Sequence, residues 1–136
     1  MLSKKTQYAF RALAHLAENY GKEPVKISNI SIQQKIPLKF LEHILNDLKK
    51  ADLLESKKGK GGGYALKISP SKINLATVIR VINGPIALLP CVSLNFYEKC
   101  RDCNEESCGM RKMMLIARDA TLKVLEKKTL TDMIQE

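Results

Sequence analysis

Residues 36–66 read IPLKFLEHILNDLKKADLLESKKGKGGGYAL, and this stretch predicts most of the fold. A helix is expected from Pro37 to about Ala51, since proline is favoured in a first helical turn. Its apolar side chains form one stripe, which comprises Leu41, Ile44, Leu45 and Leu48. Ahead of it, Ser28 is expected to cap a shorter helix that ends near Lys35. Two helices separated by so short a break are typical of a helix-turn-helix.

The second half of the same stretch predicts a β-hairpin. Strands are expected at residues 53–56 and 64–68, on either side of a turn rich in lysine and glycine. A nucleotide phosphate loop is the competing interpretation, but the sequence has no G-x-x-x-x-G-K-[ST], and a strand follows where a helix should start. The hairpin therefore predicts a DNA-binding wing, because glycines allow close approach to a groove and lysines neutralise phosphates. The wing residues expected to meet DNA are Lys57, Lys58, Gly59, Lys60, Gly61, Gly62 and Tyr64.

The longer of the two predicted helices has a polar face opposite its apolar stripe. In a helix-turn-helix the second helix lies in the major groove, where its N-terminal residues meet base edges. Lys39 suits a phosphate or a guanine, Glu42 can accept a hydrogen bond from cytosine, and His43 suits either kind of group. A solvated face that contacts nothing would have the same pattern, so the helices alone leave both interpretations open.

Charge is distributed unevenly along the 136 residues. Residues 1–90 carry 15 lysines and arginines against 6 acidic residues, whereas residues 91–136 carry 8 of each. The whole net charge of +9 therefore lies in the first part of the chain. An excess confined to one part indicates a polyanionic partner, either nucleic acid or an acidic membrane surface, and a basic surface without a partner is the alternative.

Three further helices are expected. The first spans residues 4–20, with apolar residues at helical spacing from Ala9 to Tyr20, and the second runs to residue 82 with Asn74 as its cap. The third, from about residue 107 to 128, is apolar nearly all round at its middle, so it needs a partner besides its own domain. A second copy of the chain is the simplest partner, since DNA readers of this type commonly bind as two-fold dimers. The expected dimer interface comprises Met110, Met113, Met114, Ala117, Ala120 and Val124.

All four cysteines lie in CVSLNFYEKCRDCNEESC at residues 91–108, with the spacing C-x8-C-x2-C-x4-C. Four thiolates suit a [2Fe–2S] or [4Fe–4S] cluster and equally a tetrahedral structural zinc. A thiol–disulfide switch needs only two of the four and no metal. The residues alone leave these three interpretations open.

The N-terminus has no apolar run of signal-peptide length, and no segment approaches the roughly 18 apolar residues of a membrane span. We therefore expect a cytoplasmic protein that does not associate with a membrane, in a compartment where clustered cysteines more often bind metal or sense redox state than form structural disulfides. No enzyme is expected, because His15 and His43 are the only histidines and neither lies near a plausible nucleophile in the sequence. A small iron–sulfur electron carrier would account for the cysteines but not for the basic half of the chain.

Several stretches together resemble the IscR-type (BadM/Rrf-family) transcriptional regulators. They are SKKTQYAFRAL near the N-terminus, the passage from residue 36 to 56, the wing KGKGGGYAL, and the cysteines ahead of a long helix. The resemblance implies a mainly α-helical protein with a small β-hairpin, in which a winged helix-turn-helix domain is followed by a long C-terminal dimerisation helix. It implies a homodimer on a palindromic operator in double-stranded DNA, with Ser3, Lys4, Lys5 and Tyr8 near the DNA backbone.

Several members of that family carry an iron–sulfur cluster held by three cysteines and one other ligand. The resemblance implies that Cys91 and Cys108 match the first and last cysteines, while either Cys100 or Cys103 matches the middle one, or all four ligate. We therefore expect DNA affinity to be set by a cluster or by cysteine redox state, with zinc or no metal as alternatives. The expected division is a DNA-binding domain at residues 1–83, a cysteine-bearing sensor loop at 84–106, and a dimerisation helix with a C-terminal tail at 107–136.

Overall fold

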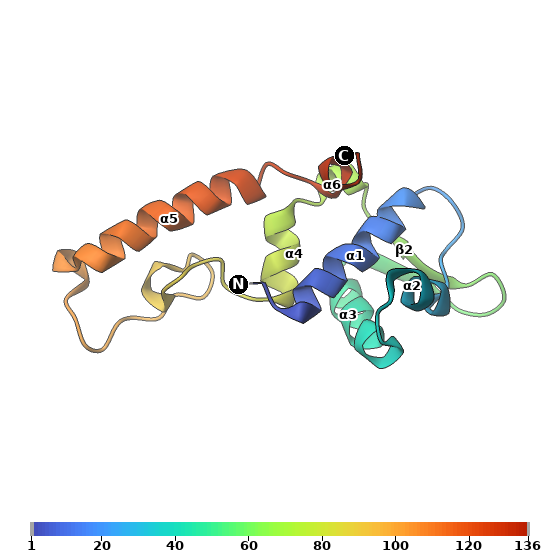
Figure 1. Ribbon diagram of the computed structural model, residues 1–136, viewed down its shortest axis with the longest axis horizontal. Helices are drawn as coiled ribbons and strands as arrows, with labels where there is room; N and C mark the ends of the chain where they lie inside the picture. The colour runs from blue at the N-terminus through green and yellow to red at the C-terminus, as the bar shows by residue number, and fades with distance from the viewer. Residues whose placement is uncertain (1, 136) are drawn as a thin grey trace.

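A computed structural model describes residues 2–135. The expected DNA-binding domain at 1–83 and the expected C-terminal segment at 107–136 each include one residue outside this range, Met1 and Glu136. In chain order the elements are α1 (Lys4–Glu18), α2 (Ile27–Gln34), α3 (Leu38–Lys50), β1 (Leu54–Lys57), β2 (Gly63–Leu66), η1 (Pro70–Lys72), α4 (Leu75–Ile82), η2 (Pro90–Val92), η3 (Glu105–Ser107), α5 (Gly109–Leu125) and α6 (Leu130–Ile134). The predicted fold class, mainly helical with a small hairpin, is confirmed. Figure 1 shows that α5 and the segment before it extend from one end of the molecule, while the hairpin lies at the other.

The core of the helical domain forms where α1 and α3 meet. The predicted stripe of α3 is fully buried at Leu41, Ile44, Leu45 and Leu48. From α1, Ala9, Leu13 and Leu16 are buried in the same cluster. Tyr20 was expected to belong to this face, but it is 45% exposed. The reason is that α1 ends at Glu18 with Asn19 as its C-cap, so Tyr20 follows the helix rather than continuing it.

The turn between α2 and α3 is closed by local hydrogen bonds. Ser31 Oγ donates to the Ile36 carbonyl at 2.6 Å, and the Ile36 N–H donates to the Ser31 carbonyl at 3.0 Å. Lys35 ends α2 in the left-handed conformation with φ 54°, and Pro37 precedes α3 at its N-cap position. The expected break between two helices is therefore present, with the second helix starting one residue later than predicted.

The predicted cap of α2 at Ser28 is wrong. Val25 is held in an extended conformation by two 2.8 Å backbone hydrogen bonds with Tyr64, so the extended segment reaches Lys26. Lys26 is the N-cap and Ser28 lies inside the helix. The pairing with a strand far away in sequence decides where α2 begins, and no local cap residue is needed.

The hairpin pairs β1 with β2 in antiparallel register, with Leu54 opposite Leu66 and Lys57 opposite Gly63. Its turn is closed by the Gly62 N–H, which donates to the Gly59 carbonyl at 3.0 Å. A Cβ on Gly62 would collide with the Lys57 carbonyl oxygen, and one on Gly63 would collide with the Val25 backbone. Both positions therefore require glycine because other backbone passes too close for a side chain.

The C-terminal part of the chain returns to the helical domain. Asn74 caps α4 as predicted, since its Oδ1 accepts from the Thr77 N–H at 2.9 Å. The long helix α5 is shorter than predicted at both ends. After it, a capping box between Thr129 and Asp132 starts α6, a helix that the sequence analysis did not anticipate. Leu130 of α6 is fully buried in the core that α1 and α3 form.

Candidate nucleic-acid interface and cysteine site

Helix α3 is the second helix of the helix-turn-helix, the recognition helix in proteins with this motif, and it presents its polar face to solvent. Lys39, Glu42 and His43, the three residues predicted to meet DNA here, are all exposed and lie opposite the buried stripe. The amphipathic pattern determines this arrangement, because burying Leu41, Ile44, Leu45 and Leu48 turns the other side of the helix outward.

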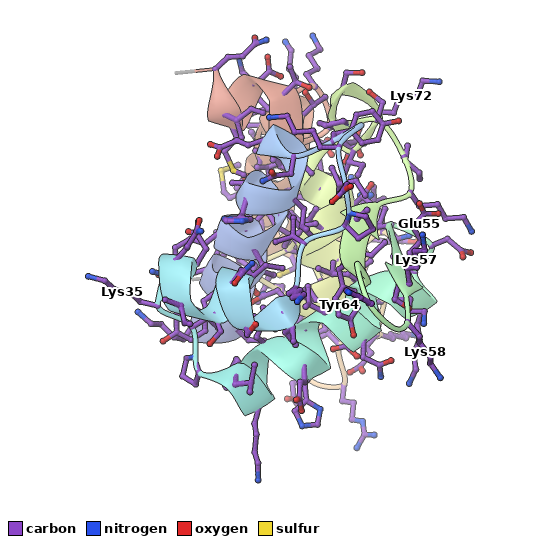
Figure 2. The ribbon with its side chains drawn as sticks, turned by 90° about the vertical axis from the view of Figure 1, so that its right-hand side faces the viewer. Lys35, Glu55, Lys57, Lys58, Tyr64 and Lys72 are labelled. Carbon is purple, nitrogen blue, oxygen red and sulfur yellow. The ribbon has the colours of Figure 1, made fainter. Side chains whose placement is uncertain are left out.

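The wing stands beside α3 and is connected to it. Lys49 Nζ, in the last turn of α3, donates to Ser56 Oγ on β1 at 2.6 Å. Lys57, Lys58 and Lys60 are exposed around the turn, and Figure 2 shows Lys57 and Lys58 pointing away from the body of the molecule. Of the predicted glycines, Gly59, Gly61 and Gly62 form the backbone of this turn. The wing therefore presents three cations on a backbone with almost no side chains to hinder close approach.

Tyr64 occupies a different position from the other predicted wing residues. It lies on β2 opposite Ser56, one residue pair from the turn, where it is partly buried against the core, and Figure 2 shows it between the hairpin and α2. Its backbone makes both hydrogen bonds to Val25. The contacts observed for Tyr64 thus join the wing to the segment before α2.

The first turns of α1 hold the remaining predicted DNA-backbone residues. Ser3 caps the helix, and its own N–H donates to Asn83 Oδ1 at 3.1 Å. Lys5 forms an ion pair with Asp47. Lys4 and Tyr8 lie close together, and Arg11, which the sequence analysis did not single out, stands over the Tyr8 ring. The spacing of Lys4, Tyr8 and Arg11 along one helix face could have indicated this cluster.

The four cysteines line one cavity of about 310 Å³ between the segment ahead of α5 and the start of that helix. Cys91 is buried, Cys100 and Cys108 are half-buried, Cys103 is exposed, and all four are free thiols. Two cations, Lys99 and Arg101, and two acidic residues, Glu98 and Asp102, also line the cavity. By its chemistry this donor set fits a thiolate-bound metal or cluster. Within residues 2–135, however, no three Cys, His, Asp or Glu side chains are placed to hold a metal ion, so the segment would have to close for binding.

Cys100 and Cys103 differ in acidity. A hydrogen bond from the Cys103 thiol, helped by the Asp102 backbone N–H, lowers the pKa of Cys100. The same hydrogen bond to Cys100 raises the pKa of Cys103 to about 12. The C-x2-C pair therefore combines one thiol with a lowered pKa and one with a raised pKa.

The loop that carries this pair is closed by Tyr97 and Glu105. The Tyr97 hydroxyl lies 2.7 and 2.8 Å from the two carboxylate oxygens of Glu105, which also accepts from the Cys100 N–H at 3.4 Å. The Tyr97 hydrogen bond lowers the pKa of Glu105, while that of Tyr97 is raised. The Nε of Arg111 nearby is buried and has no hydrogen-bond partner within the described part of the chain.

The cysteine segment is attached to α5. Arg118 has a side chain only 15% exposed, and its Nη1 donates to the Val92 carbonyl, next to Cys91, at 2.8 Å. Cys108 is itself the N-cap of α5, since its Sγ accepts from the Arg111 N–H at 3.4 Å. Two points of the segment, Val92 and Cys108, are thus attached to one helix.

Helix α5 has one covered face and one bare face. Leu122 is buried against the rest of the chain, whereas Met113 and Ile116 are 57% and 63% exposed. Of the predicted dimer residues, Met110, Met113, Ala120 and Val124 are exposed, and Met114 and Ala117 are half-buried. Beside the helix, two mainly apolar cavities of about 350 and 370 Å³ share Leu2, Ile79 and Leu125 in their walls. Within residues 2–135, no helix has both the length and the apolar character needed to cross a membrane.

An exposed recognition helix, a lysine-rich wing beside it and a separate projecting helix define a winged-helix DNA-binding regulator. The model of the Rrf2 family, described as iron-dependent transcriptional regulators, matches residues 2–136, and the chain belongs to that family. This confirms the resemblance drawn from the sequence and the expectation that the protein is a regulator and not an enzyme.

Individual relatives agree with this assignment. An rrf2-like HTH-type transcriptional regulator of Rhodobacter capsulatus is 37% identical over 138 residues, which cover 98% of this chain and 92% of the relative. The structure of CymR, the global cysteine regulator of B. subtilis, matches with a TM-score of 0.81 and 28% identity over 99% of this chain and 96% of its own. IscR of T. potens matches with a TM-score of 0.79 and 26% identity, over 99% of this chain and 86% of its own.

Proposed function

We propose that this protein binds a palindromic operator in double-stranded DNA as a homodimer in the cytoplasm, and that an iron–sulfur cluster or the redox state of its cysteines sets its affinity for that operator. The observation that carries the proposal is the cavity lined by Cys91, Cys100, Cys103 and Cys108 and attached to α5. It joins a thiol site to the helix whose bare apolar face suits a second copy of the chain.

The DNA-binding part of the proposal assigns two roles. Lys57, Lys58 and Lys60 on the wing contact phosphates, which supplies affinity for any sequence. Glu42 and His43 on the outer face of α3 read base edges in the major groove. Lys39, at the start of the same face, reaches either a phosphate or a guanine.

The dimer is supported by the bare face of α5. Met110, Met113, Ile116 and Val124 are all more than half exposed on this one helix, and exposed apolar groups of this kind mark association surfaces when they are contiguous. A two-fold dimer places two copies of α3 about 34 Å apart, one turn of DNA, and requires a palindromic site.

The cluster is supported by donor chemistry and by the family description, which names iron. The cluster would be held by Cys91, Cys100, Cys103 and Cys108. Such a cluster would supply reversible electron transfer, and it would make the protein sensitive to iron supply or nitric oxide. Arg118 holds the Cys91 end of the segment on α5, and the Tyr97–Glu105 pair shapes the loop around Cys100 and Cys103. Lys99 and Arg101 line the same cavity as Glu98 and Asp102, so the two positive and two negative side chains around the thiols balance.

Control of DNA binding follows from where the segment is attached. Closing the thiols around a bound group would move the Cys91 and Cys108 ends against α5, and so change how the two copies of α3 are placed. A bound group can shift this equilibrium only by binding one arrangement more tightly than the other. Half-sites one turn apart tolerate little error, so a small change in placement has a large effect on operator affinity.

A thiol switch or a structural zinc is the second candidate. Cys100 and Cys103 favour a switch because both line the same cavity. An oxidant such as peroxide would convert the Cys100 thiolate to a sulfenic acid, and the Cys103 thiol would then displace water from it to form the disulfide. The B. subtilis CymR structure, of a cysteine regulator, has the same fold.

One experiment separates these possibilities. The protein is purified without oxygen, its absorption spectrum is recorded, and iron, sulfide and zinc are assayed per chain. Visible absorption with iron and sulfide supports the cluster, whereas zinc alone supports a structural site. A colourless, metal-free protein that forms a Cys100–Cys103 disulfide with peroxide supports the switch.

A further inference from the structure

A cluster of aromatic and cationic side chains lies where α1 meets the start of α3. The Tyr8 ring packs edge-on against Phe40, with ring centres 5.5 Å apart and an angle of 82° between the planes. Lys4 Nζ stands 5.2 Å from the centre of the Tyr8 ring, and Arg11 Cζ stands 4.8 Å from it. Both distances are within the range of cation–π attraction.

The two cations of this cluster are not neutralised. Lys4 and Arg11 are exposed, and neither has an acidic side chain within ion-pair distance among residues 2–135. Their neighbour Lys5, in contrast, is paired with Asp47. The Tyr8 hydroxyl has no hydrogen-bond partner within the same range, so it is available to donate. Two positive charges and a free hydroxyl on one ring form a concentration of donors that suits an anion.

The cluster also lies in a specific place. Phe40 is the third residue of α3, next to Lys39 and one turn of the helix from His43, so the ring of Tyr8 borders the face that reads DNA. The guanidinium of Arg11 is positioned by stacking on that ring and needs little further ordering to bind. The anion found beside an occupied major groove is a backbone phosphate.

We infer that Arg11 joins Lys4 and Tyr8, which the family resemblance already implies lie near the DNA backbone, in a phosphate-binding site that flanks the groove occupied by α3. Arg11 is the added residue, and it extends the contact with DNA along α1 by three residues beyond Tyr8, a little less than one helical turn. Phe40 has a positioning role, since it holds the Tyr8 ring on which the cations are placed. The inference rests on the proposed DNA binding through α3, and it assigns a sequence-independent contact.

The test compares Arg11→Ala and Arg11→Lys with the control Lys22→Ala, an exposed cation beyond the far end of α1. Binding is measured by fluorescence anisotropy between about 50 and 200 mM NaCl, on a duplex selected by the wild-type protein from random DNA and on a scrambled duplex. Arg11→Ala should reduce the slope of log K against log salt by about 0.9 and weaken binding to both duplexes by a similar factor, roughly three- to tenfold. Arg11→Lys should keep the slope, and Lys22→Ala should match the wild type.

A chemical change in the DNA locates the contact. Each phosphate of the duplex is replaced in turn by an uncharged methylphosphonate. At one position the replacement should weaken DNA binding by the wild-type protein but leave binding by Arg11→Ala unchanged. The inference would be overturned if Arg11→Ala bound DNA with the affinity and salt slope of the wild type. It would also be overturned if Lys22→Ala lost as much DNA affinity as Arg11→Ala. The proposed function would stand in both cases. If the wild-type protein selects no duplex and shows no salt-dependent binding, both the proposed function and the inference fail.

Discussion

Lys5 Nζ lies 2.8 Å from Asp47 Oδ2, so an ion pair connects the first turn of α1 to the later half of the recognition helix. Both side chains are about one-third exposed, which places the pair at the rim of the domain. The pair orients α3 against α1, and it also neutralises one lysine that the family resemblance assigns to the DNA backbone. Lys5 and its neighbour Lys4 therefore differ in their capacity to bind phosphate, although both belong to the same turn.

Removing the acidic partner should make Lys5 available to DNA. Asp47→Asn is expected to tighten binding to every duplex and steepen the salt slope, because one negative charge is removed and Lys5 becomes free. The free energy of unfolding should fall by only about 0–1 kcal/mol, since the pair is partly exposed. Lys5→Ala should have little effect in the native background but a clear one in Asp47→Asn. An equal reduction of the slope in both backgrounds would mean that Lys5 leaves Asp47 for phosphate in the complex.

The wing and the recognition helix should differ in what they recognise. Each single alanine variant of the wing lysines should weaken binding to all DNA sequences alike; these variants are Lys57→Ala, Lys58→Ala and Lys60→Ala. Each should also lower the salt slope by roughly one unit for each phosphate that is no longer neutralised. Glu42→Ala and His43→Ala should change base preference instead, by ~1–3 kcal/mol for each well-formed base interaction. Competition binding against duplexes that vary at each position measures both effects. Altered preference in the wing variants alone would reverse these roles.

The bare face of α5 should determine the oligomeric state. Light scattering at micromolar protein concentration should give the wild-type protein a molar mass of about twice 15.3 kDa. Met113→Lys should shift it toward the monomer, because a charge would be buried at the centre of the apolar face. Lys112→Glu, one residue away on the polar side of the same helix, is the matched control and should remain dimeric. A folded wild-type monomer would exclude this role for α5.

The cysteines should separate into essential and replaceable positions. Cys91→Ser and Cys108→Ser should each abolish the visible chromophore of anaerobically purified protein and change operator affinity severalfold, with helix content and dimer unchanged. If only one of Cys100 and Cys103 is a ligand, one of the two single serine variants keeps the chromophore. Equal operator affinity with and without a demonstrated cluster would assign the cysteines a structural role.

The Tyr97–Glu105 pair should be visible in a pH titration. The Tyr97 hydrogen bond lowers the pKa of Glu105, so this closure of the loop is present at neutral pH and is lost as pH falls through the lowered value. Tyr97→Phe should raise the pKa of the Glu105 carboxyl toward its ordinary value, measured by carbon NMR. Tyr20→Phe, an exposed tyrosine beyond the end of α1, should leave that pKa unchanged. An unchanged value in Tyr97→Phe would show that the hydrogen bond is not formed in solution.

The elements that the sequence by itself determined are those that local rules control. The stripe Leu41, Ile44, Leu45 and Leu48 needs only the helical period to predict α3 and to turn Lys39, Glu42 and His43 outward. Asn74 caps α4 by accepting from the N–H of Thr77, three residues along the chain, so the local sequence alone indicates where the helix begins. The turn of the wing requires glycine at Gly62 because the hairpin brings its own Lys57 carbonyl too close.

Only the tertiary structure decided the features that depend on residues far apart along the chain. Pairing of Val25 with Tyr64 sets the start of α2, and burial of Leu130 against α1 and α3 brings α6 back to the domain. Lys5 and Asp47 are 42 residues apart, and Arg11, Tyr8 and Phe40 come from two helices. Periodicity and capping describe one segment at a time, whereas these contacts exist because the core fixes how the segments pack. Which cations face solvent unpaired, and which are neutralised, is therefore a property of the packed helices.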